Sequence, residues 1–235
     1  NDETAEIILL EHGPYISFAN CGLPYHIGGV IPERDSLLLL KPEEFKSMFN
    51  VEARVKQEVV SIDRKKKTVT IEDWNRDSLY TESYGKLVLS PGAAPIMPPI
   101  EGIDLPAVFS LRNVPDMDKI KAYIEDNDPS RVAVIGGGFI GVELAENLQH
   151  IGMQVTLVEM MPQVMAPIDF DMAAMVHTHM NFKQVRLALG DGLSKINQSN
   201  DGMIVTLQSG KTVVVDRVIM AIGVRPENAL AKQAD

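Results

Sequence analysis

The apolar pattern between Arg131 and Glu159 predicts a strand, a helix and a second strand in succession. Residues 132–135 are four consecutive apolar residues without a helical period, which is typical of a buried parallel strand. Apolar or small residues then recur at helical spacing, at Gly141, Leu144, Ala145 and Leu148. Gly152 ends the predicted helix, and residues 155–158 form the next strand. This order is that of a βαβ unit, so we expect a parallel sheet.

The pattern after this unit predicts one more helix and a group of antiparallel strands. A helix is expected from about 169 to 180, with core packing by Met172, Met175, Val176 and Met180. A strand follows at 185–189. Three strand-like runs at 193–197, 203–208 and 212–215 are separated by Gly-containing turns, which predicts an antiparallel β-meander. Residues 218–221 are apolar enough to return to the parallel sheet.

The first half of the chain has shorter elements. Strands are predicted at 5–10, ending in Glu11, and near 53–62, 68–74 and 84–89. Helices are predicted at 42–49 and 114–124, and a short helix is expected to begin at Cys21. Residues 37–40 are four leucines, which we interpret as core packing. Five prolines between Pro91 and Pro106 favour an extended crossing, so a domain boundary is placed near Leu111.

Composition narrows the class of protein. With 235 residues, 45% of them apolar, and a mean hydropathy near zero, the chain is typical of a water-soluble globular protein. Its net charge of −10 argues against a nucleic-acid partner or an anionic membrane surface. No apolar stretch reaches the roughly 18 residues that a membrane span needs, so a cytoplasmic setting is expected. His177 and His179 are two residues apart and face different sides of a helix, so no metal site is expected.

The glycines after residue 135 form the first candidate binding site. Gly136, Gly138 and Gly141 form G-x-G-x-x-G between a predicted strand and helix, and Glu159 ends the next strand. Backbone N–H groups of such a turn bind a pyrophosphate, and the acid binds a ribose. An ordinary glycine-tight βαβ crossover is the alternative. Because no Lys or Arg occurs between Met160 and Phe182 to neutralise a 2′-phosphate, NADH is favoured over NADPH.

Cys21 is the one cysteine, so no disulfide can form within this chain. Its redox partner would have to be a small thiol, an oxygen species or a second chain. At the start of a helix, free N–H groups and the helix dipole would favour a thiolate. The alternative is a small buried residue without chemistry.

Four segments of the chain together resemble the flavin-dependent pyridine nucleotide-disulfide oxidoreductases. The resemblance is to the single-cysteine branch, which contains coenzyme A disulfide reductases, NADH oxidases and NADH-dependent persulfide reductases. The segments are SFANCGLPYHIGG at 17–29, LVLSPGAAP at 87–95, VAVIGGGFIGVELAENL at 132–148 and VIMAIGVRPEN at 218–228. They span essentially the whole chain. SFANCGLPY is the most specific and is most similar to the coenzyme A disulfide reductase type.

The resemblance implies an α/β fold with two related Rossmann-like, FAD/NAD(P)-binding domains. Residues 1–110 would form a partial FAD-binding domain with the redox cysteine, 111–228 the NADH-binding domain, and 229–235 the start of a returning FAD-domain segment. The implied function is hydride transfer from NADH through FAD to an oxidised Cys21, as a mixed disulfide with coenzyme A or a persulfide. An NADH oxidase or peroxidase that cycles Cys21 through sulfenic acid is the alternative, and a non-catalytic NADH-binding module is a third.

The resemblance also assigns site residues. Phe139 matches the aromatic residue over the flavin, Glu143 the acid near nicotinamide, and Glu11 the acid that binds the FAD ribose. The expected NADH site consists of Gly136, Gly137, Gly138, Phe139, Ile140, Gly141, Glu159 and Gly223. The expected FAD site consists of Glu11, Asn20, Ser90, Pro91, Gly92 and Ala93. Without the resemblance, Phe139 would be interpreted as packing at the helix start and Glu143 as a surface residue.

Two parts of the family pattern are missing. No glycine fingerprint for FAD precedes Ala5, and neither the later flavin segment nor the dimer-interface domain is among these 235 residues. We therefore expect an internal piece of a longer, homodimeric enzyme. The piece alone is expected to bind NADH, to hold FAD weakly and to have little turnover.

Overall fold

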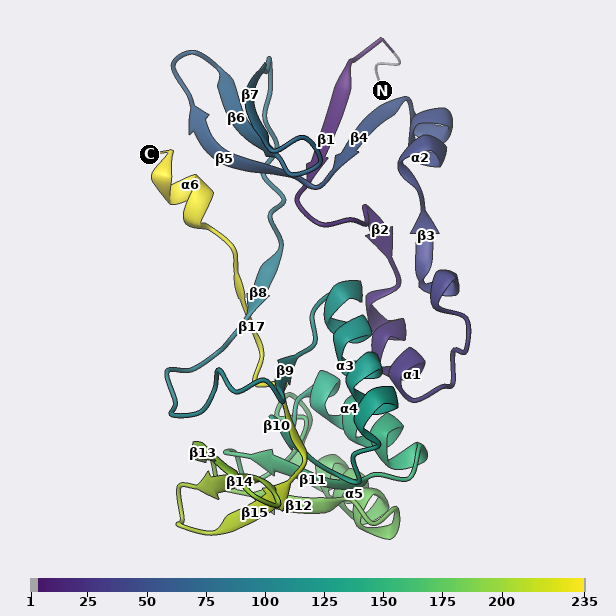
Figure 1. Cartoon of the computed structure of the whole chain (residues 1–235), viewed down its shortest axis with the longest axis vertical. Helices are drawn as coiled ribbons and strands as arrows, with labels where there is room; N and C mark the ends of the chain where they lie inside the picture. Colours follow the sequence, from purple (N-terminus) through teal and green to yellow (C-terminus); the bar gives the residue numbers. More distant parts are fainter. Residues whose placement is uncertain (1–3, 235) are drawn as a thin grey trace. The chain divides into compact units, whose positions relative to one another are not determined.

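The computed structural model describes residues 4–234, which divide into two compact units (Figure 1). The first unit contains residues 4–19, 35–93 and 226–234. The second unit contains residues 20–34 and 94–225. The sequence placed a boundary near Leu111, whereas this division assigns residues 94–110 and the segment around Cys21 to the second unit. The two-stranded sheet of β8 (Ala93–Pro95) and β17 (Val224–Pro226) contains two of the points where the chain passes between units.

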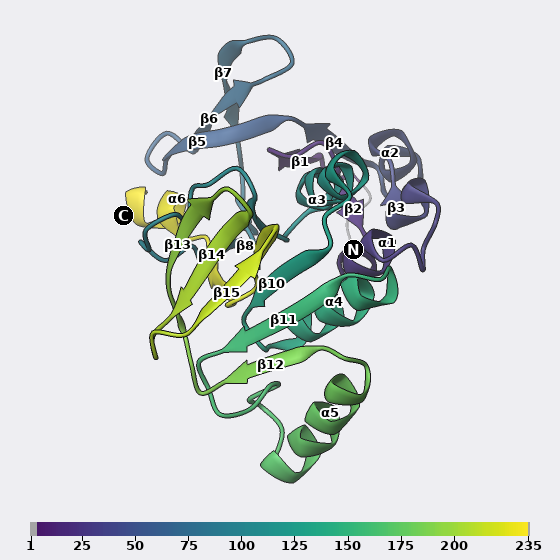
Figure 2. The ribbon, with the colours of Figure 1, turned by 60° about the horizontal axis from the view of Figure 1, so that its bottom comes forward.

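A five-stranded parallel sheet forms the centre of the second unit. Its strands lie in the order β12, β11, β10, β16, β9, and Figure 2 shows β10, β11 and β12 side by side. Their bounds are β9 (Val108–Ser110), β10 (Arg131–Ile135), β11 (Gln154–Glu159), β12 (Arg186–Leu189) and β16 (Arg217–Met220). Val132 pairs with Val155 on one side and Arg217 on the other. The predicted parallel sheet is confirmed.

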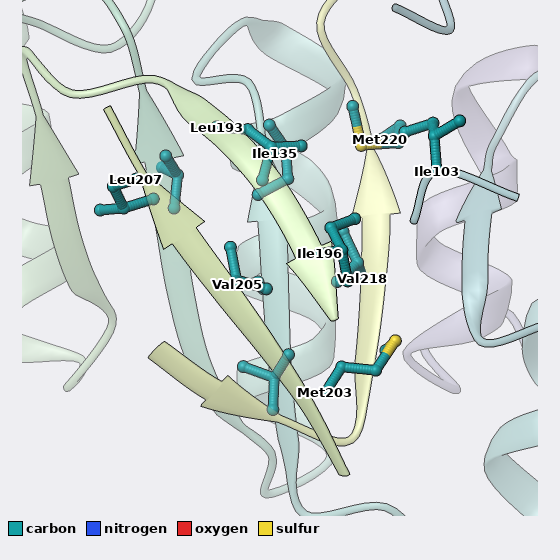
Figure 3. Packing of buried hydrophobic residues seen from close by; sticks show 12 residues of the cluster. Ile103, Ile135, Leu193, Ile196, Met203, Val205, Leu207, Val218 and Met220 are labelled. Atoms are coloured by element: carbon teal, nitrogen blue, oxygen red, sulfur yellow. The ribbon is translucent and has the colours of Figure 1, made fainter. Parts of the chain in front are cut away.

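The antiparallel meander covers one face of this sheet. It consists of β13 (Leu193–Ser199), β14 (Gly202–Leu207) and β15 (Thr212–Val215), as predicted. Its apolar side chains, including Ile196 and Val205, pack against Ala133 and Ile135 of β10 and Val218 of β16 (Figure 3). Because side chains alternate along a strand, Val132 and Val134 point to the opposite face.

Helices pack on that opposite face. They include α3 (Val114–Asn127) and α4 (Phe139–His150); α4 contacts both β10 and β11, and the short α1 (Leu23–Ile27) packs on α3 and α4. The side chain of Asn113 caps α3 by accepting the backbone N–H of Asp116. The predicted sheet-facing stripe of α4, at Gly141, Leu144, Ala145 and Leu148, is buried throughout.

Helix α5 (Phe170–Phe182) corrects the predicted packing. Met172 and Met175 are 57% and 67% exposed, so the interpretation of both as core residues is wrong. Within α5 only Ala173 and Met180 are buried, two turns apart. The helix therefore buries one narrow stripe, and helical spacing alone does not show how wide the buried face is.

The first unit contains three small sheets. β1 (Ile7–Glu11) pairs in parallel with β4 (Val51–Val55), and β2 (Ser17–Phe18) pairs with β3 (Leu38–Leu40). The third is an antiparallel sheet of β5 (Gln57–Asp63), β6 (Thr68–Asp73) and β7 (Ser78–Ser83). The remaining elements are α2 (Pro42–Phe49), α6 (Ala229–Gln233) and the 3-10 helices η1 (Asn20–Gly22) and η2 (Arg34–Leu37). The last two begin in the second unit.

Two sequence-based predictions fail in the first unit. Residues 84–89 form no strand, and Val88 is 83% exposed, because no described strand pairs with this apolar segment. Among the strands that the sequence pattern does not predict is β7, whose mostly polar sequence lacks a strong apolar alternation. The leucines 37–40 agree only in part with core packing, since Leu37 is buried and Leu39 is exposed.

An ion pair joins the starts of β10 and β16. Arg131 donates to Asp216 from Nη2 at 2.6 Å, and Asp216 also accepts the backbone N–H groups of Ser130 and Arg131. Burial alone would raise the pKa of Asp216. The hydrogen bonds from Arg131 and Ser130 outweigh it, so the pKa lies below its usual value.

We expect Asp216→Asn to lower the free energy of unfolding by about 1–2 kcal/mol at pH 7. A carboxyl whose pKa is lowered by folding stabilises the folded state above its unfolded pKa of about 3.9. The difference between variant and parent should therefore shrink as the pH falls from about 4 through the lowered pKa. Urea unfolding at a series of pH values measures this, with the exposed Asp104→Asn as control. A difference that is the same at every pH would contradict the assignment.

Candidate active site

The glycine-rich turn lies between β10 and α4, and close approach of the backbone requires its glycines. Gly136 has φ of +111°, and a Cβ there would overlap the carbonyl oxygen of Ala221 and lie 2.6 Å from its carbonyl carbon. A Cβ on Gly141 would overlap the carbonyl oxygen of Gly136. By contrast, a Cβ on Gly138, the N-cap of α4, would meet nothing within 4 Å. The turn thus packs tightly on its protein side and is open at the helix start, as a pyrophosphate would require.

Glu159 lies at the end of β11 beside this turn. Its Oε2 accepts the backbone N–H of Gly137 at 2.6 Å, and its Oε1 accepts that of Met161 at 2.7 Å. A carboxylate has about four lone-pair positions, so two remain for ribose hydroxyls. The side chain is partly exposed and held by two backbone donors, which fits the predicted role of a ribose-binding acid.

The first turn of α4 presents apolar side chains to solvent. Phe139 is 56% exposed, and Ile140 is also exposed. Phe139 therefore does not pack into the helix start, which was the alternative interpretation of this residue. One turn later, Glu143 is half-buried, and burial, followed by the charge of Glu146, raises its pKa. An acid with a raised pKa at a helix start is suited to holding or donating a proton.

Cys21 belongs to η1 at the start of α1, as predicted, and its side chain is exposed. The exposure excludes the alternative of a small buried residue. α1 approaches α4 closely because Gly28 has no side chain: a Cβ there would lie 2.7 Å from Cβ of Asn147. Asn147 is buried and donates to the carbonyl oxygen of Glu143 at 2.8 Å. Cys21 and Glu143 thus lie on two packed elements of one unit.

Tyr25 of α1 interacts electrostatically with Cys21 and Glu143, which the sequence pattern does not indicate. Burial raises its pKa, and so do the charges of Glu143, Glu146 and Cys21. Its phenol therefore lies in the field of the same acids and sulfur that make up the candidate site. The available signal was its position four residues after Cys21, which places both on one side of a short helix.

The residues expected to bind FAD lie in different units. Glu11 and residues 90–93 belong to the first unit, and Asn20 to the second. Glu11 accepts the backbone N–H of Gly13 at 2.7 Å. Gly92 has φ of +73°, and its carbonyl oxygen accepts the N–H of Glu227 at 2.9 Å. Gly223, expected in the NADH site, has φ of +112° and lies two residues after Ala221, which packs on Gly136.

Metal-ligand clusters and membrane-spanning helices are absent from the part of the chain that the structure describes, residues 4–234. Within this range no group of three or more His, Cys, Asp or Glu side chains could hold a metal ion. None of the helices described there is both long and apolar enough to cross a membrane. His177 is instead a hydrogen-bond acceptor for the backbone N–H of Val164, at 3.1 Å.

A parallel sheet, a glycine-rich turn before α4 and an acid at the end of β11 together define a Rossmann-type dinucleotide-binding protein. Residues 1–235 match the family described as pyridine nucleotide-disulphide oxidoreductase, and the chain belongs to it. The family, the α/β fold class and the classification as an oxidoreductase are thereby confirmed. FAD and NADH, the expected cofactors, agree with this family.

Individual relatives support the single-cysteine branch. An NADH oxidase of Methanocaldococcus jannaschii is 36% identical over 97% of this chain and 51% of its own length. A coenzyme A disulfide reductase of Staphylococcus aureus is 32% identical over 100% of this chain and 52% of its length. The crystal structure of reduced Bacillus anthracis CoADR-RHD is 52% identical, with a TM-score of 0.95 over 99% of this chain and 42% of that one. The chain spans about half the length of the curated relatives it matches.

Proposed function

We propose that the whole protein is an NADH-dependent flavoprotein that reduces coenzyme A disulfide or a related persulfide through Cys21. The observation that carries the proposal is the packing of α1 on α4. It brings an exposed cysteine into the unit that has the glycine-rich turn, Glu159 and Glu143. The chain spans about half the length of these relatives, so the activity of the whole protein is part of the proposal.

Different residues of this chain bind NADH, hold a proton near the nicotinamide and hold FAD. The turn at 136–141 and the start of α4 bind the pyrophosphate of NADH, and Glu159 accepts hydrogen bonds from the ribose. Phe139 covers the nicotinamide end, and Glu143 holds a proton near it. Glu11, Asn20 and residues 90–93 would hold FAD. The flavin, when bound, supplies the relay of two electrons between nicotinamide and sulfur.

Cys21 carries the sulfur chemistry. Its thiolate attacks one sulfur of coenzyme A disulfide, forms a mixed disulfide and releases one coenzyme A thiolate. Two electrons from NADH then cleave the mixed disulfide, which releases the second coenzyme A and restores the Cys21 thiolate. One NADH and one proton are consumed for each pair of thiols formed. We further propose a cytoplasmic homodimer for the whole protein.

A second candidate function is that of an NADH oxidase or peroxidase, favoured by the Methanocaldococcus relative of that name. There, peroxide would oxidise Cys21 to sulfenic acid, which NADH would reduce again. The same residues bind the nucleotide in both cases, so only the oxidant differs. In a third alternative, a non-catalytic NADH-binding module, Cys21 would be inert.

A single-turnover experiment separates these functions. The full-length protein is reduced with one equivalent of NADH and mixed with coenzyme A disulfide, a persulfide or hydrogen peroxide, while flavin absorbance and free thiol are followed. Rapid reoxidation with two thiols released per NADH supports the disulfide reductase. Rapid reoxidation by peroxide alone supports the second function, and no reaction with any oxidant supports the third.

Glu159→Gln should change the choice of nucleotide. The amide keeps one acceptor for a backbone N–H but loses the negative charge that repels a 2′-phosphate. We expect about tenfold weaker NADH binding, unchanged or tighter NADPH binding, and hence a smaller NADH preference. Titration of this chain with both nucleotides measures it, and the exposed Glu125→Gln is the control. An unaltered NADH:NADPH ratio would remove Glu159 from the ribose site.

A further inference from the structure

The segment between β11 and α5, residues 160–169, is fastened to the glycine-rich turn. The backbone N–H of Met165 donates to the carbonyl oxygen of Gly137 at 2.7 Å. Val164 is fully buried, and a Cβ on Gly137 would lie 3.1 Å from its Cγ1 and 3.1 Å from Cβ of Glu159. Val164 therefore packs directly against the turn and beside the stem of the acid. A shift of this segment would move both groups that are expected to hold the nucleotide.

The segment has its own internal hydrogen bonds. Gln163 donates from Nε2 to the carbonyl oxygen of Ile168 at 2.8 Å, and the N–H of Ile168 donates to the carbonyl oxygen of Met165 at 2.9 Å. Met165 has φ of +52°. These bonds give the segment a shape but do not fix it to α5.

His177 of α5 provides a side-chain anchor from outside the segment. Its Nε2 accepts the backbone N–H of Val164 at 3.1 Å, which requires the ring proton to be on Nδ1 when the ring is neutral. The imidazole and the Phe170 ring form a T-shaped pair, with centroids 6.4 Å apart. Because Val164 is buried, its N–H would lose its partner if the imidazole were removed.

We propose that His177 is a positioning residue for the nucleotide site. Acting through Val164, it holds the glycine-rich turn and Glu159 in the geometry that binds the adenosine ribose and discriminates NADH from NADPH. His177 need not touch the nucleotide. This inference rests on the proposed NADH site and adds to it a residue from α5, the helix that follows β11.

The test compares three substitutions at one position. His177→Leu removes the acceptor. His177→Gln retains a hydrogen-bond acceptor at nearly the same distance from the backbone, because the end of the Gln side chain occupies a position similar to that of Nε2. His177→Asn retains a polar group that is too short to reach Val164. His179→Leu, an exposed residue of the same helix, is the matched control. Dissociation constants for NADH and NADPH are measured by calorimetry on the 235-residue chain.

We expect NADH to bind about tenfold more weakly to His177→Leu and His177→Asn, with a smaller change for NADPH. His177→Gln and His179→Leu should remain within about twofold of the parent. Amide hydrogen exchange should be faster at Val164 and Met165 in the first two variants and unchanged in the others. If His177→Leu fails to fold, the difference in NADH affinity between His177→Asn and His177→Gln tests the proposal.

Two negative results are distinguishable. If the parent chain binds neither nucleotide, the proposed function itself fails. If the parent binds NADH and His177→Asn binds it equally well with the same NADH:NADPH ratio, only the role of His177 is overturned. If all three substitutions weakened the binding of NADH and of NADPH by the same factor, His177 would have a merely structural role. That result would also overturn the proposal.

Discussion

Cys21→Ser in the full-length protein is expected to lower coenzyme A disulfide reduction by at least about a thousandfold while leaving NADH binding unchanged. A serine hydroxyl is not ionised at neutral pH and cannot form a mixed disulfide. Cys21 is the one cysteine among these 235 residues. Because Cys21 is exposed, the substitution removes no buried packing, so the free energy of unfolding should change by less than about 0.5 kcal/mol.

The measurement is thiol release under steady-state turnover, with NADH affinity determined separately by titration. Cys21→Ala should behave in the same way, which separates loss of the sulfur from any effect of the hydroxyl. Retention of more than about a tenth of the parental turnover would show that the electrons reach the disulfide without Cys21. Loss of NADH binding in either variant would show that the nucleotide site depends on the cysteine, contrary to our assignment.

Gly136→Ala is expected to weaken NADH binding by at least about a hundredfold and to lower the free energy of unfolding by about 3 kcal/mol. Gly136 has a positive φ, which is strained for alanine, and its new Cβ would lie against backbone atoms of Ala221. Since backbone cannot rotate away as a side chain can, the turn must shift. The N–H groups aimed at the pyrophosphate would then lose their alignment.

Gly152→Ala is the matched control for this prediction. Gly152 also has a positive φ, of +90°, but a Cβ there would meet nothing within 4 Å. Gly152→Ala should therefore lower the free energy of unfolding by only about 1 kcal/mol, through backbone strain, and leave NADH binding unchanged. Calorimetric binding and urea unfolding of both variants supply the data. If both variants lost the same NADH affinity and the same stability, backbone strain, rather than the contact with Ala221, would determine the role of Gly136.

The sequence predicts most of the second unit because its elements have distinctive local patterns. The continuous apolar run at 132–135, the glycines after it and the helical stripe of α4 each specify their own structure. Together they place Glu159 beside the turn, since the carboxyl ends of adjacent parallel strands meet at one edge of a sheet. The meander was equally clear from its glycine-containing turns.

Properties that depend on distant partners were not predictable. The segment 84–89 is predicted as a strand, but a strand needs a neighbour, and none of the described strands pairs with it. Exposure of Met172 and Met175 depends on what lies beside α5. No sequence pattern predicts the hydrogen bond from Val164 to His177, because its donor is a backbone N–H in a loop.

The burial of Arg217 is another property that the sequence does not predict. It is fully buried with its guanidinium 4.4 Å from the centre of the Tyr123 ring, and burial lowers its pKa to about 10. Its side-chain nitrogens have no hydrogen-bond partner among the residues that the structure describes. Charged residues are almost never fully buried without a partner, so no sequence rule would place this one beneath a helix.

The packing of α1 on α4 has a consequence for how the enzyme could be studied. Since Gly28 allows the short α1 to pack closely against Asn147 of α4, Cys21 and Glu143 belong to the same compact unit. Spectroscopic labels attached at positions 21 and 143 would therefore report a constant separation under any rearrangement that leaves that unit intact. A change in their separation would be a specific indicator that the cysteine helix has detached from its support.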